Sequence, residues 1–143
     1  MRNRILFVLI AILFTGTVWS ADTSAQTQTK GKPLPADGGE PWKAYVQYCK
    51  AMDAGDVAAL KKLMSADNVK DMDKPEFKQF FPIMRSMHAK EIKMKSGTID
   101  GKTATILATG KDQNGKVTTG TITMIQEDNQ WKMKEDAWVT QMN

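Results

Sequence analysis

The sequence contains one cysteine and one histidine among its 143 residues. A single cysteine excludes an intrachain disulfide framework and a cluster of thiolate metal ligands. The lone His88 excludes a zinc site built from several histidines and any mechanism that needs two imidazoles. We therefore expect no metal and no cofactor. The excess of positive charge is also small, +4, and no basic stripe is interleaved with aromatic residues, so nucleic acid is not an expected partner.

Long apolar runs are absent except for one near the N-terminus, Ile5 to Phe14. Ten apolar residues are too few to span a bilayer, which needs about 20. The run follows two arginines and precedes small polar residues, which is the pattern of a secretory signal peptide. We predict a signal peptide at residues 1–25, cleaved after Ser20 or Ala25, and hence a periplasmic or secreted bacterial protein with no membrane contact after cleavage. The alternative is an uncleaved N-terminal anchor.

The rest of the chain divides into a short polar segment and one domain. Residues 26–40 contain two prolines and three glycines without apolar periodicity, and we expect a flexible lead-in. Residues 41–143 are enough for a single hydrophobic core.

The first half of this domain has a helical pattern. Apolar residues recur at three- and four-residue steps from Pro41 onward: Trp42, Tyr45, Val46, Cys49 and Met52. Gly55 then ends the first helix, and Asp56 caps a second one that carries Val57, Leu60, Leu63 and Met64.

A third helix is predicted from about Asp73 to Met87. Its apolar residues are expected to be buried: Phe77, Phe80, Phe81, Met84 and Met87. Pro82 should kink or split this helix because it removes a backbone hydrogen bond.

The second half has the period of strands. Turn signals at Asp100-Gly101, Asn114-Gly115 and Asp128-Asn129 predict four antiparallel strands at about residues 90–99, 102–111, 116–127 and 130–140. Two-residue turns at these three sites would set the register of every strand pair. A bulge in a long strand would shift the assignments beyond it.

This register assigns side chains to two faces of the sheet. The core face collects Ile92, Met94, Leu107, Ile122, Met124, Trp131, Met133, Ala137 and Val139. The outer face has an apolar island of Ala104, Ile106, Ala108, Ile125 and Trp138. Apolar patches with polar rims mark interfaces. We therefore expect a homodimer or a protein partner to bind through Ile106, Ile125 and Trp138.

These elements predict an α+β fold in which three N-terminal helices pack on a curved four-stranded antiparallel meander. The segment Ala51-Met-Asp-Ala-Gly-Asp56, followed by two leucines, and the ending Asn129-Gln-Trp131-Lys-Met resemble the nuclear transport factor 2-like (cystatin-like) superfamily. The similarity spans about residues 40–140 and is closest to small exported members of unknown function. The resemblance implies a cone-shaped sheet around a long helix, often with an interior pocket. It also implies a superfamily that includes cyclase-like and isomerase-like enzymes beside non-catalytic binding domains.

Glu135 is the candidate catalytic residue, because the predicted register places its carboxylate on the core face. Burial there would raise its pKa toward neutrality and suit it to general acid–base catalysis. An open sheet end or a bulge would instead leave it in solvent. The residues expected to line the pocket are Tyr45, Cys49, His88, Leu107, Ile122, Met124 and Met133. For His88 the alternative is an interaction with the last carbonyls of its own helix.

Two functions therefore follow from the sequence. The first is an exported, non-catalytic binding or interaction domain whose possible ligand is small and apolar. The alternative is a small pocket enzyme of the cyclase, isomerase or dehydratase type with Glu135 as its acid or base. The first is favoured because the predicted faces bring no acid–base pair together, and no strand supplies an inward-facing aspartate.

Overall fold

The computed structural model of the protein describes residues 31–140. The predicted signal peptide and its cleavage site lie outside these residues. The elements follow one another as β1 (Lys32–Pro33), α1 (Gly39–Ala54), α2 (Val57–Leu63), α3 (Ala66–Met72), α4 (Pro75–Met87), β2 (Lys90–Asp100), β3 (Thr103–Lys111), β4 (Val117–Glu127) and β5 (Gln130–Thr140). None of the helices described between residues 31 and 140 has the length and apolar character needed to cross a membrane.

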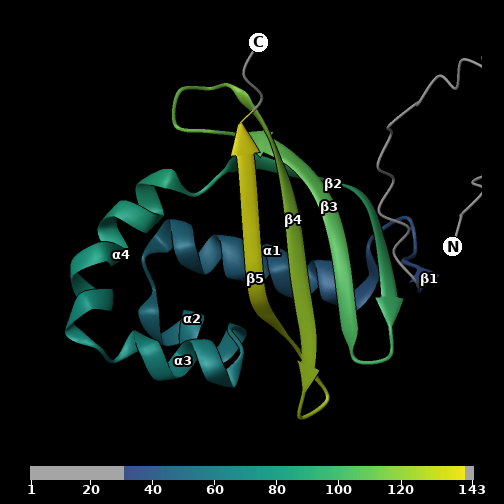
Figure 1. The fold of residues 1–143 in the computed structure, drawn as a ribbon, viewed down its shortest axis with the longest axis horizontal. Coiled ribbons are helices and arrows are strands. Elements are labelled where there is room, and N and C mark those ends of the chain that lie inside the picture. Colours follow the sequence, from purple (N-terminus) through teal and green to yellow (C-terminus); the bar gives the residue numbers. More distant parts are fainter. Residues whose placement is uncertain (1–30, 141–143) are drawn as a thin grey trace, which may run out of the picture.

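The five strands form one antiparallel sheet in the order β1-β2-β3-β4-β5. The sheet is curved, and α1 runs across its concave face (Figure 1). The predicted α+β fold and the β2–β5 meander are confirmed. The two-residue strand β1 lies within the segment expected to be a flexible lead-in, where the Leu34 amide also donates to the Gly97 carbonyl at 2.8 Å.

The junction between α1 and α2 forms as the sequence predicts. Gly55 ends α1 with a left-handed backbone (φ 71°), and the Asp56 carboxylate accepts a hydrogen bond from the Ala59 amide at 2.9 Å. Arg85 of α4 adds a contact that the sequence pattern does not predict. Its guanidinium donates to two carbonyls in the last turn of α1, Met52 O at 3.0 Å and Asp53 O at 2.6 Å.

The predicted third helix is wrong in two respects. A separate helix, α3, precedes it, with the Ser65 side chain at its N-cap. In addition, α4 continues through Pro82 as one helix, which excludes the split into two helices that was one of the two predicted effects of this proline. Pro82 and Lys78 are both exposed, so the Lys78 carbonyl that loses its intrahelical partner is on the solvent side of the helix and can be hydrated.

The burial predicted for α4 is also largely wrong. Phe81 is buried and stacks on the half-buried Phe77 with ring centroids 5.2 Å apart. By contrast, Phe80, Met84 and Met87 are 53%, 42% and 66% exposed. The helix stands beyond the edge strand β5 rather than over the sheet (Figure 1), so only a narrow face of it is covered.

The register of β3 differs from the prediction on both sides, by two residues against β2 and by one residue against β4. The first turn is formed by Gly101 and Lys102, because Asp100 pairs with Thr103. The second connection is a five-residue loop closed by the pair of Lys111 and Val117. The third turn, Asp128-Asn129, has both the predicted two-residue form and the predicted position, with φ angles of 49° and 60°.

A one-residue shift turns every side chain of a strand to the opposite face. The core residues of β3 are therefore Ala104, Ile106 and Ala108, each 0% exposed, whereas Leu107 is 42% exposed. Ile106 was expected on the outer face and Leu107 on the core face, and both placements are wrong. Ile125 remains on the outer face, half-buried.

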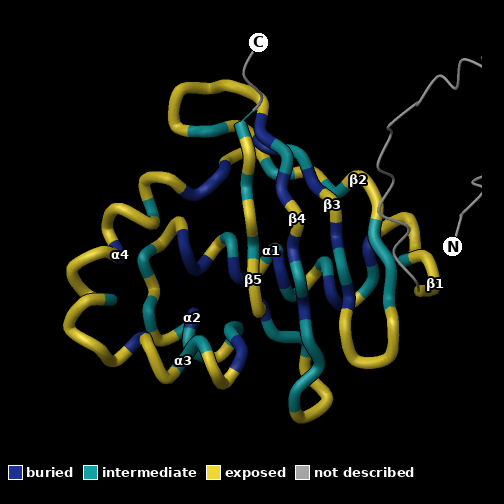
Figure 2. The backbone as a smooth tube through the Cα atoms, viewed as in Figure 1, coloured by how far each residue is buried: buried dark blue, intermediate teal, exposed yellow. Residues whose placement is uncertain are grey.

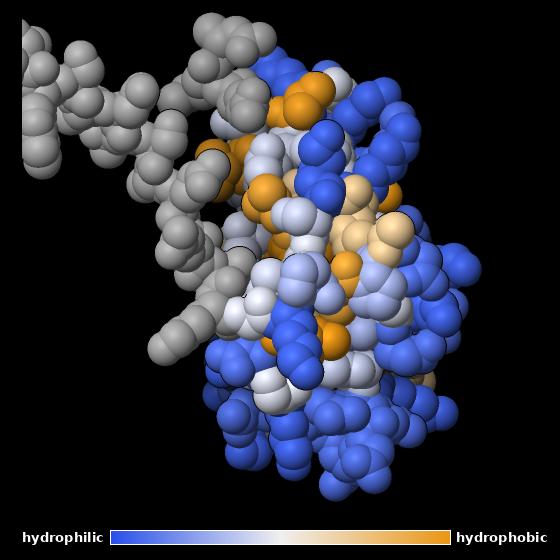
Figure 3. All heavy atoms as spheres, turned by 90° about the vertical axis from the view of Figure 1, so that its right-hand side faces the viewer, coloured by the Kyte–Doolittle hydropathy of each residue, from blue (hydrophilic) through white to orange (hydrophobic). Residues whose placement is uncertain are grey.

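The core lies between α1 and the concave face of the sheet. Buried positions alternate along β3 and β4, where they face α1 (Figure 2). Its largest fully buried side chains include Tyr45, Leu60, Ile106, Ile122 and Met124. Figure 3 shows the β1–β2 side of the molecule. Outside the grey atoms, apolar and polar residues are interspersed on this surface.

Candidate functional site

A bulge in β5 determines which of its side chains enter the core. Met124 pairs with Met133 and Thr123 pairs with Glu135, which leaves Lys134 as an extra residue on β5. The inward positions are therefore Trp131 and Met133 before the bulge, and Asp136 and Trp138 after it.

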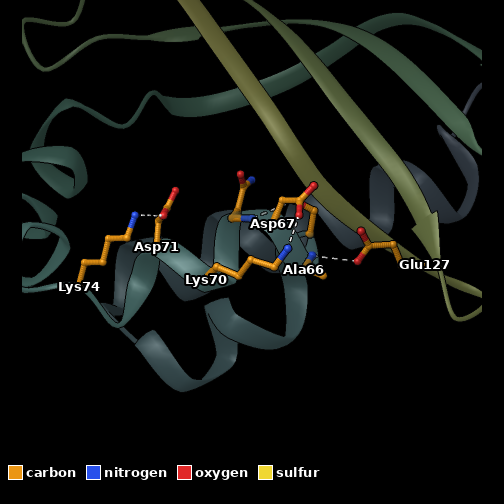
Figure 4. Close-up of polar contacts among 8 residues, drawn as sticks. Ala66, Asp67, Lys70, Asp71, Lys74 and Glu127 are labelled. Atoms are coloured by element: carbon orange, nitrogen blue, oxygen red, sulfur yellow. Dashed lines mark hydrogen bonds and ion pairs between the residues drawn. The ribbon is translucent and has the colours of Figure 1, made fainter.

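Helix α3 holds this bulge in place. The Asn68 side-chain amide donates to the Lys134 carbonyl at 2.7 Å, and the Ser65 amide donates to the Met133 carbonyl at 2.9 Å. The helix is also attached to β4, where the Glu127 carboxylate accepts from the Ala66 amide at 3.0 Å (Figure 4). A carboxylate at a helix N-terminus satisfies a free amide and opposes the helix dipole.

The bulge places Glu135 in solvent and Asp136 inside. Glu135 is exposed, so the prediction that it faces the core is wrong, for the reason anticipated for a bulge. The Asp136 side chain is 18% exposed, and its Oδ2 accepts a hydrogen bond from the Tyr45 hydroxyl at 3.1 Å. Tyr45 is 0% exposed. Burial is the main cause that raises the pKa of Tyr45, and the nearby charge of Asp136 raises it further, so the hydroxyl stays protonated and donates.

His88 lies beside this pair. It follows α4 directly, and its imidazole points into the core rather than to the carbonyls of its own helix, with a side chain that is 4% exposed. Its Nε2 is 4.0 Å from Asp136 Oδ2, and its ring meets the edge of Tyr48 at 5.9 Å between centroids. Neither ring nitrogen has a hydrogen-bond partner among the residues that the structure describes. Burial lowers the pKa of His88 more than the nearby carboxylates raise it, which favours the neutral imidazole.

Trp138 completes the group on the sheet side. Its ring lies flat on Gly120, where a Cβ atom would be 2.6 Å from the indole, and its far edge reaches Gly110. The indole N–H is buried without a hydrogen bond of normal geometry within residues 31–140, although it lies near enough to Tyr45 to act on that pKa. Trp138 was expected on the outer face, and that placement is wrong because of the bulge. We call Tyr45, Tyr48, His88, Asp136 and Trp138 the interior cluster.

A pocket opens next to the interior cluster, between the end of α4, the loop that joins β3 to β4 and the end of β5. It has a volume of about 190 Å³, and we call it the mouth pocket; its lining residues are Met87, Ala89, Asp112, Gln113, Thr118, Trp138 and Thr140. Trp138 belongs to both the pocket and the cluster, and Met87 and Ala89 flank His88 in the chain. The mouth pocket therefore adjoins the interior cluster through Trp138, and His88 itself is not among the residues that line it.

A second pocket, of about 150 Å³, lies between α1 and the start of β2. Cys49 lines it together with Trp42, Val46 and Ile92. Burial raises the pKa of the Cys49 thiol to about 12, so this thiol is protonated and a poor nucleophile at neutral pH.

The predicted pocket residues thus separate into three groups. Tyr45 and His88 meet in the interior cluster, and Cys49 lines the second pocket. Ile122, Met124 and Met133 are buried in the core beneath α1. Leu107 is on the opposite face of the sheet.

The interior cluster can donate and accept protons. A carboxylate and a neutral imidazole 4.0 Å apart are an acid–base pair, and a single oxygen atom can lie within hydrogen-bond distance of both. Asp136 and its pairing with His88 were missed because the predicted two-residue turns carried no bulge. The sequence of β5 did contain a signal for the bulge, because without one the strict alternation of faces buries Glu135 and exposes Trp138. Within residues 31–140, no three His, Cys, Asp or Glu side chains gather as metal ligands.

No protein-family model and no curated protein matches the chain. Solved structures do. A nuclear transport factor 2-like protein of unknown function from Silicibacter pomeroyi is similar with 15% identity and a TM-score of 0.50, over 71% of this chain and 93% of that one. A candidate dehydratase of the nuclear transport factor 2-like family from Streptomyces avermitilis is similar with 14% identity and a TM-score of 0.54, over 75% of this chain and 98% of that one. The chain therefore has the nuclear transport factor 2-like fold, as its sequence predicted.

Proposed function

We propose that this protein is an exported binding domain that holds a small molecule at the mouth pocket and the interior cluster. The observation that carries the proposal is the set of three buried nitrogens that have no hydrogen-bond partner within residues 31–140, two on His88 and one on Trp138. Buried polar groups are nearly always paired, and an unpaired one costs free energy comparable to a lost hydrogen bond. A ligand in the adjacent pocket of about 190 Å³ would supply the missing partners.

Binding without chemistry is favoured by how closely the cluster is packed. Tyr45 and Tyr48 are 0% and 3% exposed, and their rings stack at 5.7 Å between centroids. The aromatic rings therefore occupy much of the space that a substrate would need in order to lie between α1 and β5. A ligand that rests in the mouth and reaches inward with one polar group needs no such space.

An NMR screen of small neutral and charged compounds tests the proposal. The chain has one histidine, so the imidazole signals belong to His88 without ambiguity. We expect compounds that bind to shift the His88 ring and Trp138 indole signals together and to leave the Trp42 indole unchanged. Thr140→Trp should block binding by filling the pocket, and Thr119→Trp on the outer face is its control. A screen in which no compound moves the two signals would rule the binding site out.

Export is tested on the same protein. The full chain is expressed in a bacterial host, and the periplasmic and secreted fractions are analysed by mass spectrometry. We expect to find the protein in one of these fractions with an N-terminus directly after Ser20 or Ala25. An N-terminus still at Met1 would contradict cleavage.

A second candidate function is acid–base catalysis with Asp136 in the role first expected for Glu135. The specific observation in its favour is the juxtaposition of Asp136 with His88 at 4.0 Å. The similarity to a candidate dehydratase is consistent with this chemistry but extends to the fold alone.

Exchange of the α-protons of cyclohexanone in D₂O, followed by NMR, tests this candidate. A general base is worth about 10² to 10⁴ in rate, so the wild-type protein should exceed Asp136→Asn by about that factor. Glu135→Gln removes the neighbouring, exposed carboxylate and should leave the rate unchanged. Equal rates for the wild type and Asp136→Asn would exclude Asp136 as a base for this reaction.

A further inference from the structure

The unpaired groups of the interior cluster limit what kind of ligand can satisfy them. Trp138 offers a donor only, because an indole nitrogen has no free acceptor. Neutral His88 offers one donor and one acceptor, and the Asp136 carboxylate offers acceptors only. A ligand group that both donates and accepts can therefore satisfy more of these atoms than one that does only one of the two.

The charge of the cluster narrows the choice further. Asp136 is its only carboxylate, and within the cluster no lysine or arginine balances it. An anionic ligand would bring a second negative charge into a poorly solvated site, which is unfavourable. An ammonium ligand would pair with Asp136, but it has no acceptor for the Trp138 N–H. A hydroxyl group donates to Asp136 or to the acceptor nitrogen of His88, and it accepts from the indole.

The lining and the volume of the mouth pocket indicate the chemistry and the size of the rest of the ligand. Met87, Ala89 and Trp138 present apolar surface, Thr118 and Thr140 add methyl groups beside their hydroxyls, and Asp112 and Gln113 complete the lining with polar side chains. A volume of about 190 Å³ accommodates one small ring.

We infer that the ligand is a small neutral compound with a hydroxyl group on an apolar ring, an alicyclic alcohol or a phenol. The inference rests on the proposed function. In it, the ring occupies the mouth pocket and the hydroxyl hydrogen-bonds to the Trp138 indole and to His88 or Asp136.

Four probes that share one ring and differ in the attached group test this inference: phenol, benzene, benzoate and benzylammonium. Each is titrated into the full-length protein at pH 7.5 while the His88 ring and Trp138 indole signals are followed by NMR. A buried hydrogen bond discriminates by about tenfold or more, so phenol should bind at least about tenfold more tightly than benzene. Benzoate and benzylammonium should each bind at least about tenfold more weakly than phenol for the reasons of charge and acceptor count.

A matched pair of variants tests whether the Trp138 indole N–H causes the preference for phenol over benzene. Trp138→Phe keeps an aromatic ring without the N–H, and it should bring phenol and benzene to equal affinity. Trp131→Phe on the same strand, before the bulge, should leave the preference intact. If Trp138→Phe does not fold, the wild-type titration still decides, because the Trp138 N–H signal must shift downfield with phenol and not with benzene.

The possible outcomes separate the two proposals. Binding of all four probes with similar affinity, or tightest binding of benzylammonium or benzoate, would overturn the ligand class and leave the binding site standing. A preference for phenol that survives in Trp138→Phe would also overturn it. No binding of any probe would overturn the ligand class and count against the proposed binding site as well.

Discussion

Replacing Tyr45 with phenylalanine tests the interior cluster directly. The substitution removes one buried hydroxyl and leaves the aromatic packing intact. Asp136, whose side chain is 18% exposed, then loses the hydrogen bond that it accepts at 3.1 Å. Hydrogen bonds to charged groups contribute about 1.5–3 kcal/mol, so we expect the free energy of unfolding to fall by about 2 kcal/mol. For a domain of this size, that corresponds to a decrease in Tm of about 8 °C.

Tyr48→Phe is the matched control, one turn further along the same helix. The Tyr48 ring is also buried, but no described residue forms a hydrogen bond with its hydroxyl. Its replacement should therefore cost less than about 0.5 kcal/mol. Urea unfolding of both variants, with Asp136→Asn and the double variant completing a cycle, isolates the coupling between Tyr45 and Asp136. Equal destabilisation by the two tyrosine variants, or additive effects in the cycle, would refute the reasoning.

Four further predictions follow from other parts of the structure. Burial lowers the pKa of His88 below its value of about 6.5 in the unfolded chain, so the unfolded chain binds more protons as the pH falls. The free energy of unfolding should therefore decrease between pH 7.5 and pH 5. Urea unfolding at both pH values should show this decrease in the wild type and not in His88→Gln. Asn68→Ala removes the side chain that holds the bulge, and we expect faster amide hydrogen exchange along β5 beyond residue 134, with protection of β3 unchanged. Gly120→Ala places a Cβ against Trp138 and should lower the free energy of unfolding by about 1–3 kcal/mol in thermal unfolding; an unchanged Tm would contradict the close contact. If the expected homodimer forms through the outer sheet face, Leu107→Lys should halve the mass measured by sedimentation equilibrium, whereas an unchanged mass would exclude Leu107 from the interface.

The helices and strands were predictable where local signals are strong. The four long strands begin and end within one residue of the predicted bounds, because Thr- and Ile-rich alternation and turn residues are local properties. The same is true of Gly55 and Asp56 between α1 and α2, where one residue ends a helix and the next caps another. The fold class and the likeness of the fold to nuclear transport factor 2-like proteins depend on these features, and both are confirmed.

The faces of the strands were not predictable to the same degree. Asn114-Gly115 suits a two-residue turn, but Asp112 instead organises a five-residue loop, and its Oδ1 accepts from the Asn114 and Lys116 amides, each at 2.9 Å. Both connections are compatible with the residues of this segment, so the local pattern does not choose between them. The bulge at Lys134 depends on Asn68, which lies 66 residues earlier in the chain. The local pattern shows only the anomaly, a buried glutamate and an exposed tryptophan, and does not identify the distant residue that resolves it.

The unpaired Lys134 separates the two halves of β5 in a way that has evolutionary meaning. If Lys134 instead paired with Thr123 and the strand had no bulge, Glu135, Ala137 and Val139 would turn inward in place of Asp136 and Trp138. The lining would change from aromatic and hydrogen-bonding to mostly aliphatic without a single amino-acid replacement. Deleting Lys134, by contrast, would keep Asp136 and Trp138 inward, because Glu135 would still pair with Thr123. A protein of this shape that lacks the extra residue can therefore keep the same lining, and an alignment must place its gap at the bulge in order to pair residues that share a face.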